Sequence, residues 1–150
     1  MTTTAHAYTK TAYGMGQKLV NLSTDTFKVM LLSAYTVGAT QDSAQFVADV
    51  LAVATEASGT GYTAGGQTLA GTSFANSGHI TTLTASTNPS WNAAGGSLAA
   101  AYVLFFDSTP GSNATNPVLC YWDLGGTLTA TNATFGLGIP GGGIMTWTVS

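Results

Sequence analysis

Side chains that can do chemistry are few in this sequence and lie far apart. The 150 residues include three lysines, six acidic residues, two histidines, one cysteine and no arginine, so that only 6% are charged. A globular domain is usually about 25% charged. General acid–base catalysis and metal binding both draw on these residue types. The composition therefore predicts a protein that is not an enzyme and that holds no metal ion or cofactor.

Two pairs of acidic residues come closest to an arrangement that could catalyse a reaction. Asp107 and Asp123 each end a candidate strand and could be neighbours, while Asp42 and Asp49 lie two turns apart on a candidate helix. Acid–base hydrolysis of a glycosidic bond needs two carboxyl groups facing one pocket, with perturbed pKa values. Helix capping and turn formation account for these residues more simply. We therefore expect structural roles for all four.

The remaining reactive groups and glycine motifs also favour structural roles. Cys120 has apolar neighbours and is expected to be a buried thiol, and His6 and His79 are too far from it in sequence to predict a zinc site. The glycines at 14–18 lack the spacing of a phosphate-binding loop. Those at 59–66 lack the dinucleotide pattern and follow a helix rather than a strand. A structured turn is the better interpretation of this second motif.

The aromatic residues raise the alternative of a carbohydrate-binding surface. Trp122 and Trp147 occupy inward positions of candidate strands, where they are expected to anchor the core. Trp91 lies in a loop between Asn88 and Asn92 and is the tryptophan left free to stack on a sugar ring. A carbohydrate-binding module using Trp91 therefore stays open as a less favoured function.

The positions of β-branched and aromatic residues between turn signals predict a mainly β fold. A helix is expected at residues 43–55, where Asp42 is the candidate N-cap and Gln45 completes a capping box. We expect Met145, Trp147 and Val149 to face inward. The predicted strands lie at 26–32, 79–85, 100–106, 117–123, 127–135 (with a bulge or tight turn near Asn132) and 144–149. The predicted architecture is an antiparallel β-sandwich, of jelly-roll, immunoglobulin-like or similar type.

The organisation expected from the sequence is an extended N-terminal arm at residues 1–17 followed by a single β-rich domain at 18–150. The arm is polar and is expected to reach across a neighbouring molecule. The candidate assembly contacts are Tyr8, Lys10, Tyr13, Met15, Lys18, Tyr62 and Trp91.

Charge and hydropathy limit the kinds of partner. The net charge of -3 and the absence of a basic cluster argue against nucleic acid. The N-terminus lacks the basic and apolar regions of a signal peptide. The longest apolar run, at 98–106, is about half of the ~20 residues that a membrane span requires. No nucleic-acid or membrane partner is therefore expected.

Several segments occur in an order that points to a known family. A strand opener at 21–32 (NLSTDTFKVMLL) precedes a helix-like stretch that ends at Glu56, and SGTGYTAGG follows at 58–66. An aromatic strand (YVLFFD) comes next, then PVLCYWDLG and a final strand with alternating threonines. Over roughly residues 18–150 the chain resembles a widespread family of small virion proteins of tailed bacteriophages.

The resemblance implies a structural role in a phage particle and supplies no catalytic motif. It leads us to expect a capsid decoration protein that binds where capsomers meet and stabilises the shell, with the major capsid protein or other virion proteins as partners. A homo-oligomer, for which a trimer is one arrangement, is also expected. The protein would be made in the host cytoplasm and located at the virion surface. A tail or fibre-associated virion protein is the alternative.

Overall fold

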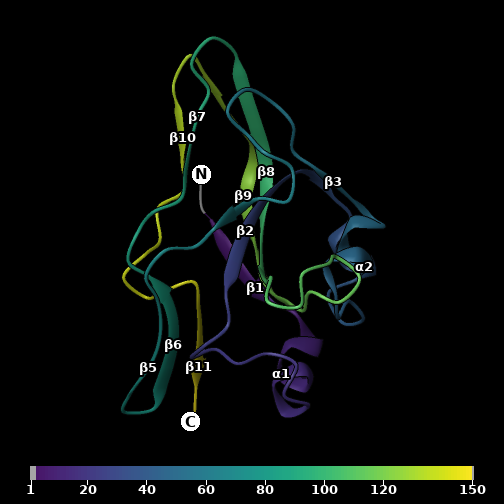
Figure 1. The fold of residues 1–150 in the computed structure, drawn as a ribbon, viewed down its shortest axis with the longest axis vertical. Helices are drawn as coiled ribbons and strands as arrows, with labels where there is room; N and C mark the ends of the chain where they lie inside the picture. Colours follow the sequence, from purple (N-terminus) through teal and green to yellow (C-terminus); the bar gives the residue numbers. More distant parts are fainter. Residues whose placement is uncertain (1–2, 150) are drawn as a thin grey trace.

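Two long antiparallel strands, β8 (Ser97–Asp107) and β9 (Val118–Thr131), form the centre of the structure (Figure 1). The computed structural model describes residues 3–149. The two central strands belong to a main sheet of six strands in the order β1-β9-β8-β2-β3, with β4 also pairing to β2. The other strands of this sheet are β1 (Thr4–Ala7), β2 (Phe27–Tyr35), β3 (Ala54–Glu56) and β4 (Gln67–Thr68).

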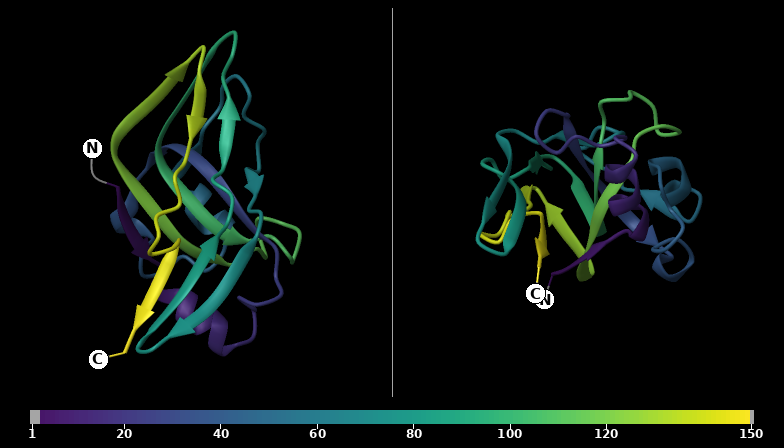
Figure 2. Two further views of the ribbon diagram at one scale, coloured as in Figure 1. Left: turned by 90° about the vertical axis from the view of Figure 1, so that its left-hand side faces the viewer. Right: turned by 90° about the horizontal axis from the view of Figure 1, so that it is seen from below.

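Two small antiparallel sheets form a second layer over one face of the main sheet. Figure 2 shows them one above the other in front of β8 and β9. One consists of β10 and β7, and the other has the order β11-β6-β5. The bounds are β5 (Thr72–Ser77), β6 (Ile80–Ala85), β7 (Ser90–Asn92), β10 (Thr134–Gly136) and β11 (Met145–Thr148). The predicted mainly β, antiparallel, sandwich-like architecture is confirmed.

Both faces of the middle of the main sheet are buried, along most of β2 and β8 and the first half of β9, so the protein has two hydrophobic cores. Alternation along β2 sends Phe27, Val29 and Leu31 into the first core, beneath the small sheets. Met30 and Leu32 enter the second core, which is covered by α2 (Val47–Leu51) and by Tyr8. The alternation predicted for β2 is therefore correct. The face that carries Met30 and Leu32 is not open to solvent, because α2 and Tyr8 cover it.

Irregularities in β9 adapt this strand to the two cores. Phe105 pairs with Cys120 whereas Phe106 pairs with Val118, so Leu119 is an extra residue and both Leu119 and Cys120 point into the first core. A larger irregularity opposite Ala101 contains Gly125, whose φ of 76° favours glycine. Asn132, also with positive φ, makes the turn that the sequence predicts near this position.

The predicted helix at 43–55 is shorter than expected. Only α2 (Val47–Leu51) is α-helical, and Asp42 is not its N-cap, because its Oδ1 accepts a hydrogen bond from the Thr9 hydroxyl at 2.7 Å. Asp49 Oδ2 accepts the N–H groups of Gln45 and Phe46 instead. The helix starts late because Gln45 O accepts the N–H of Val118, which ties the preceding residues to β9.

The N-terminal segment is not an extended arm, which corrects the expectation for residues 1–17. Its residues from Thr4 onward form β1, which pairs with β9, and the helix α1 (Thr9–Gly16); Met1 and Thr2 lie outside the described residues. Tyr8 is 2% exposed, and its hydroxyl lies 2.8 Å from that of Tyr35. The segment folds back because Tyr8 fills the second core and the Thr11 hydroxyl donates to backbone carbonyls of β9.

The C-terminal strand also departs from the prediction at one residue. Met145 is buried and Trp147 packs at the margin of the first core, as expected. Val149 was expected to face inward but is 72% exposed, because it follows the last residue of β11 and extends beyond the layer.

We expect Tyr8→Ala to lower the free energy of unfolding by about 3–5 kcal/mol, because it empties part of the second core. Tyr13→Ala is the matched control in the same segment. Tyr13 is 51% exposed, so its loss should change stability by no more than about 0.5 kcal/mol. Chemical denaturation of both variants checks this. Equal effects of the two substitutions would contradict the burial of the N-terminal segment.

Candidate assembly surface

The residues predicted as assembly contacts do not form one surface. Tyr8 and Trp91 are buried, at 2% and 5% exposure, so both are wrong as surface contacts. Trp91 lies in β7, where its ring packs between those of Tyr62 and Phe135 in the first core. This burial also removes the residue on which a carbohydrate-binding site was based.

The other predicted contacts are divided between α1 and separate loops. Tyr13 is exposed, and the Lys10 Nζ lies 4.9 Å from the centroid of its ring. Met15 is half-buried against the first core, whereas Lys18 is exposed in the loop after α1. The structure places these four near one another and leaves their role in assembly a prediction.

Tyr62 has a structural role within the SGTGYTAGG segment. It accepts a hydrogen bond from the Leu31 N–H at 3.1 Å and donates one to Glu56 Oε1 at 2.8 Å. Glu56 Oε1 also accepts the N–H of Gly65 at 2.6 Å. Along β2, the residues before Leu31 pair with β4 and the residues after it pair with β3. The tyrosine hydroxyl therefore occupies the gap between the ends of these two partner strands.

Asp107 and Asp123, which could have formed a catalytic pair, lie apart. Asp123 pairs with Tyr102, five positions along β8 from Asp107, which is about 16 Å at the usual rise per residue. Asp123 Oδ1 accepts the N–H of Gly125, and Asp107 Oδ1 accepts that of Thr109, both at 2.8 Å. These contacts show turn-forming roles. Burial raises the pKa of the Cys120 thiol, so this group is poorly suited to act as a nucleophile.

Neither a cluster of potential metal ligands nor a helix able to cross a membrane occurs in the part of the chain that is described. Between residues 3 and 149, His, Cys, Asp and Glu side chains do not gather in threes where they could hold a metal ion. Within the same residues, none of the helices has the length and apolar character that a membrane crossing requires.

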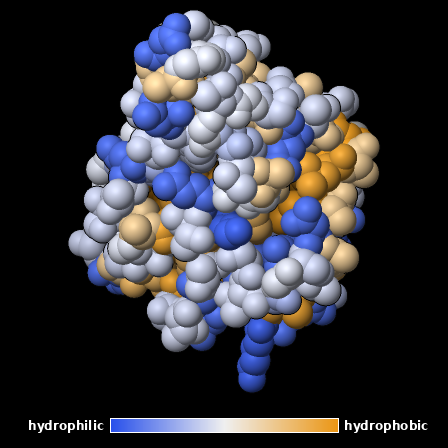
Figure 3. All heavy atoms as spheres, turned by 45° about the horizontal axis from the view of Figure 1, so that its top comes forward, coloured by the Kyte–Doolittle hydropathy of each residue, from blue (hydrophilic) through white to orange (hydrophobic). Residues whose placement is uncertain are grey.

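The distribution of charge over the two layers is uneven. The strands of both small sheets lie in two stretches, 57–106 and 124–150, that contain no Asp, Glu, Lys or Arg. The charged residues all belong to the main sheet, the helices or the loops joining them, and they are Lys10, Lys18, Asp25, Lys28, Asp42, Asp49, Glu56, Asp107 and Asp123. The pale colours of residues with intermediate hydropathy dominate the face drawn in Figure 3. The sequence already carries this signal, as two long uncharged stretches, which becomes visible only when the chain is viewed by segments rather than residue by residue.

The outer face of the β11-β6-β5 sheet is one such uncharged surface. We call it the threonine face, and it comprises Ala75, Ser77, Ile80, Thr82, Thr146 and Thr148. Ile80 is 46% exposed. A hollow of about 410 Å³ lies on this face, where Gly141 and Gly142 flank the strands. The face therefore combines hydroxyl groups, small side chains and one large apolar residue without any charge.

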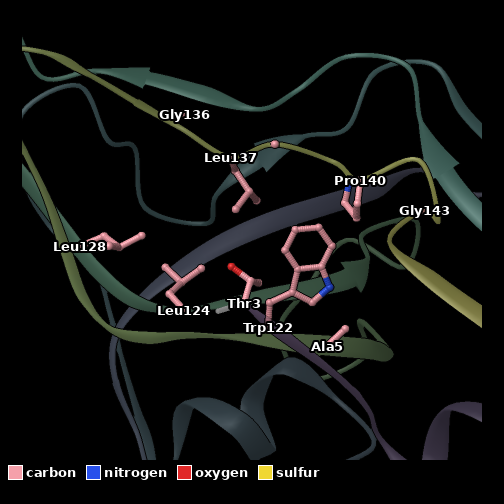
Figure 4. Close-up of a pocket in the computed structure, with 10 residues that line it drawn as sticks. Thr3, Ala5, Trp122, Leu124, Leu128, Gly136, Leu137, Pro140 and Gly143 are labelled. Carbon is pink, nitrogen blue, oxygen red and sulfur yellow. The ribbon is translucent and has the colours of Figure 1, made fainter. Parts of the chain in front are cut away.

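A second hollow, of about 400 Å³, opens between β9 and the glycine-rich chain that follows β10 (Figure 4). The Trp122 ring projects into it, and Leu124, Leu137 and Pro140 line it. The indole Nε1–H is already used, since it donates to Ile144 O at 3.2 Å. The hollow therefore offers an apolar wall with little to orient a polar ligand.

Comparison with known proteins supplies no family for the chain. No family model, curated protein or solved structure matches it.

We expect Tyr62→Phe to lower the free energy of unfolding by about 1–3 kcal/mol, because it leaves the Leu31 N–H without its partner. Tyr102→Phe is the matched control, since Tyr102 is half-buried in β8 and its hydroxyl makes no hydrogen bond to residues 3–149. Denaturant titration of the two variants measures the difference. Equal stability of both would show that the tyrosine hydroxyl does not hold the segment in place.

Proposed function

We propose that this chain is a structural protein that packs its uncharged layer against other subunits of an assembly. The observation that carries the proposal is the absence of Asp, Glu, Lys and Arg from the strands of both small sheets. Burying a charged group is far more costly than burying a hydroxyl that finds a hydrogen bond. A surface of threonine, serine and glycine can therefore be covered by a partner at low cost.

The geometry of the β11-β6-β5 sheet supports the same proposal. β5 and β11 are the two edges of this sheet among the described strands, and every residue of β5 after Thr72 is exposed. A partner strand could add to such an edge through main-chain hydrogen bonds, which need no charged side chains. The threonine face lies beside both edges, so one partner could contact face and edge together.

We propose further that the assembly is a tailed-bacteriophage particle and that the chain is a capsid decoration protein. This part rests on the resemblance of residues 18–150 to small virion proteins. Its partners would be the major capsid protein and further copies of the chain, and its site of action would be the particle surface. The fold is compatible with this role, since Tyr62 and Glu56 give the SGTGYTAGG segment a packing role rather than a catalytic one.

Quantitative mass spectrometry of purified particles of the phage that encodes this chain tests the proposal. We expect the chain to be present in an amount that approaches that of the major capsid subunit. A tail or fibre-associated protein would be far scarcer, and this result would replace decoration by the tail alternative. Absence of the chain from the particle would refute a virion role.

We expect Ile80→Glu to weaken binding to the particle by at least about tenfold, because it buries an unpaired charge against the partner. Thr55→Glu is the matched control. It adds the same charge at an exposed strand residue of β3, which lies on the opposite side of the molecule from β6 (Figure 1). Co-sedimentation with particles that lack the chain measures occupancy. Equal occupancy by both variants would exclude the threonine face as the contact.

A further inference from the structure

Asp107, at the end of β8, carries a buried oxygen without a partner. The residue is 0% exposed, and its Oδ1 accepts the Thr109 N–H at 2.8 Å. Its Oδ2 is also buried and makes no hydrogen bond to the described part of the chain. A charged oxygen in this environment is costly unless something compensates it.

A second carboxyl group, that of Asp25, lies within hydrogen-bonding reach of Asp107. Three hydrogen bonds of the next residue, Thr26, hold Asp25 beside the loop that follows Asp107. The Thr26 carbonyl accepts the N–H of Ser108 at 2.8 Å and its hydroxyl at 2.9 Å, and the Thr26 N–H donates to Thr109 Oγ1 at 2.9 Å. Two carboxylates cannot hydrogen-bond to each other unless one of them carries a proton.

Among the described residues, no lysine is one of the groups that shift the pKa of Asp107. Lys28 pairs with Phe106, so its side chain points to the face of the sheet opposite to Phe27 and Asp107. Lys18 lines a hollow beside Phe74. The adjoining loop, 108–117, contains no charged residue. A proton is therefore the simplest compensating charge for two carboxylates in contact.

We propose that Asp25 and Asp107 share one proton in the folded protein, and that its loss loosens the loop 108–117. Burial chiefly raises the pKa of Asp107 to about 6, and the hydrogen bond and the charge of Asp25 add to the rise, despite opposing hydrogen bonds from Thr109. This device is independent of the proposed assembly function and is tested on the isolated chain.

The loop beside the pair supports α2, so loosening would spread to the second core. The Asn116 carbonyl accepts the N–H of Val47 at 3.0 Å, and the Asn113 carbonyl accepts that of Ala48 at 2.8 Å. The Asn116 side chain in turn accepts the N–H of Gly111. Repulsion between two ionised carboxylates would act at the start of this loop, where Asp107 N–H donates to Pro117 O.

The direction of the pH effect follows from the raised pKa. A carboxyl group with a higher pKa in the folded state binds its proton more tightly when folded, so stability is greatest at low pH. The stabilisation that the bound proton gives to the folded state is complete below about pH 4, the pKa of the group in the unfolded chain. It is lost as the pH rises to about 6. The contribution of the pair is read as a difference between the native chain and a variant.

Asp107→Asn tests the proposal, because the amide permanently imitates the protonated carboxyl group and can donate to Asp25. The variant should lower the unfolding equilibrium constant at about pH 7 by roughly 100-fold relative to the native chain, and the difference should disappear at about pH 4. Asp123→Asn is the matched control. Asp123 makes the same 2.8 Å bond to the N–H two residues ahead but is partly exposed, so its replacement should not reproduce the roughly 100-fold effect at about pH 7.

Two measurements on the native chain keep the test decisive if the variant folds poorly. Carboxyl-carbon NMR should show Asp107 titrating near pH 6, and amide exchange of Ala48, corrected for intrinsic rates, should accelerate between about pH 5 and about pH 7. Titration of Asp107 near its ordinary pKa of about 4 would overturn the proposal. Stabilisation by Ca²⁺ at neutral pH would also overturn it, because the pair would then hold a cation.

Discussion

The burial of both faces in the middle of the main sheet, along most of β2 and β8 and the first half of β9, is the constraint on which the rest of this structure depends. A sheet with one solvated face needs a single covering layer, but here each face carries large apolar side chains. The small sheets cover the first face. Tyr8, α2 and the chain around it cover the second. The N-terminal segment is therefore part of the fold because without Tyr8 the second core would be open to water.

The scarcity of charge is compatible with this architecture because the acidic residues act as hydrogen-bond acceptors for loops. Glu56 organises the SGTGYTAGG segment, and Asp49 accepts the N–H groups at the start of α2. Asp42 links the start of α1 to the loop before α2 through Thr9. The few carboxylates thus stabilise the folds of particular turns, and the second layer, whose strands pair through backbone bonds, needs none.

The parts of the fold that the sequence predicted are those where a local pattern was sufficient. The alternation in β2, the apolar run of β8 and the turn at Asn132 each depend on neighbouring residues, and each is confirmed. The errors concern residues whose environment comes from distant chain. Trp91 looked like a loop residue, but pairing of β7 with β10 buries it. The candidate surface was missed for a related reason, since uncharged stretches become a face only when β5, β6 and β11 pair.

Charge segregation also has a consequence for the speed of association. Partners that meet through oppositely charged surfaces are steered together and can bind at up to about 10⁹ M⁻¹s⁻¹, whereas neutral surfaces usually reach about 10⁵–10⁶ M⁻¹s⁻¹. An encounter through the threonine face would belong to the slower class and would be nearly insensitive to ionic strength. Tight occupancy would then have to come from slow dissociation, or from several copies held close together on one scaffold. An uncharged contact layer thus favours a complex that forms slowly and dissociates slowly.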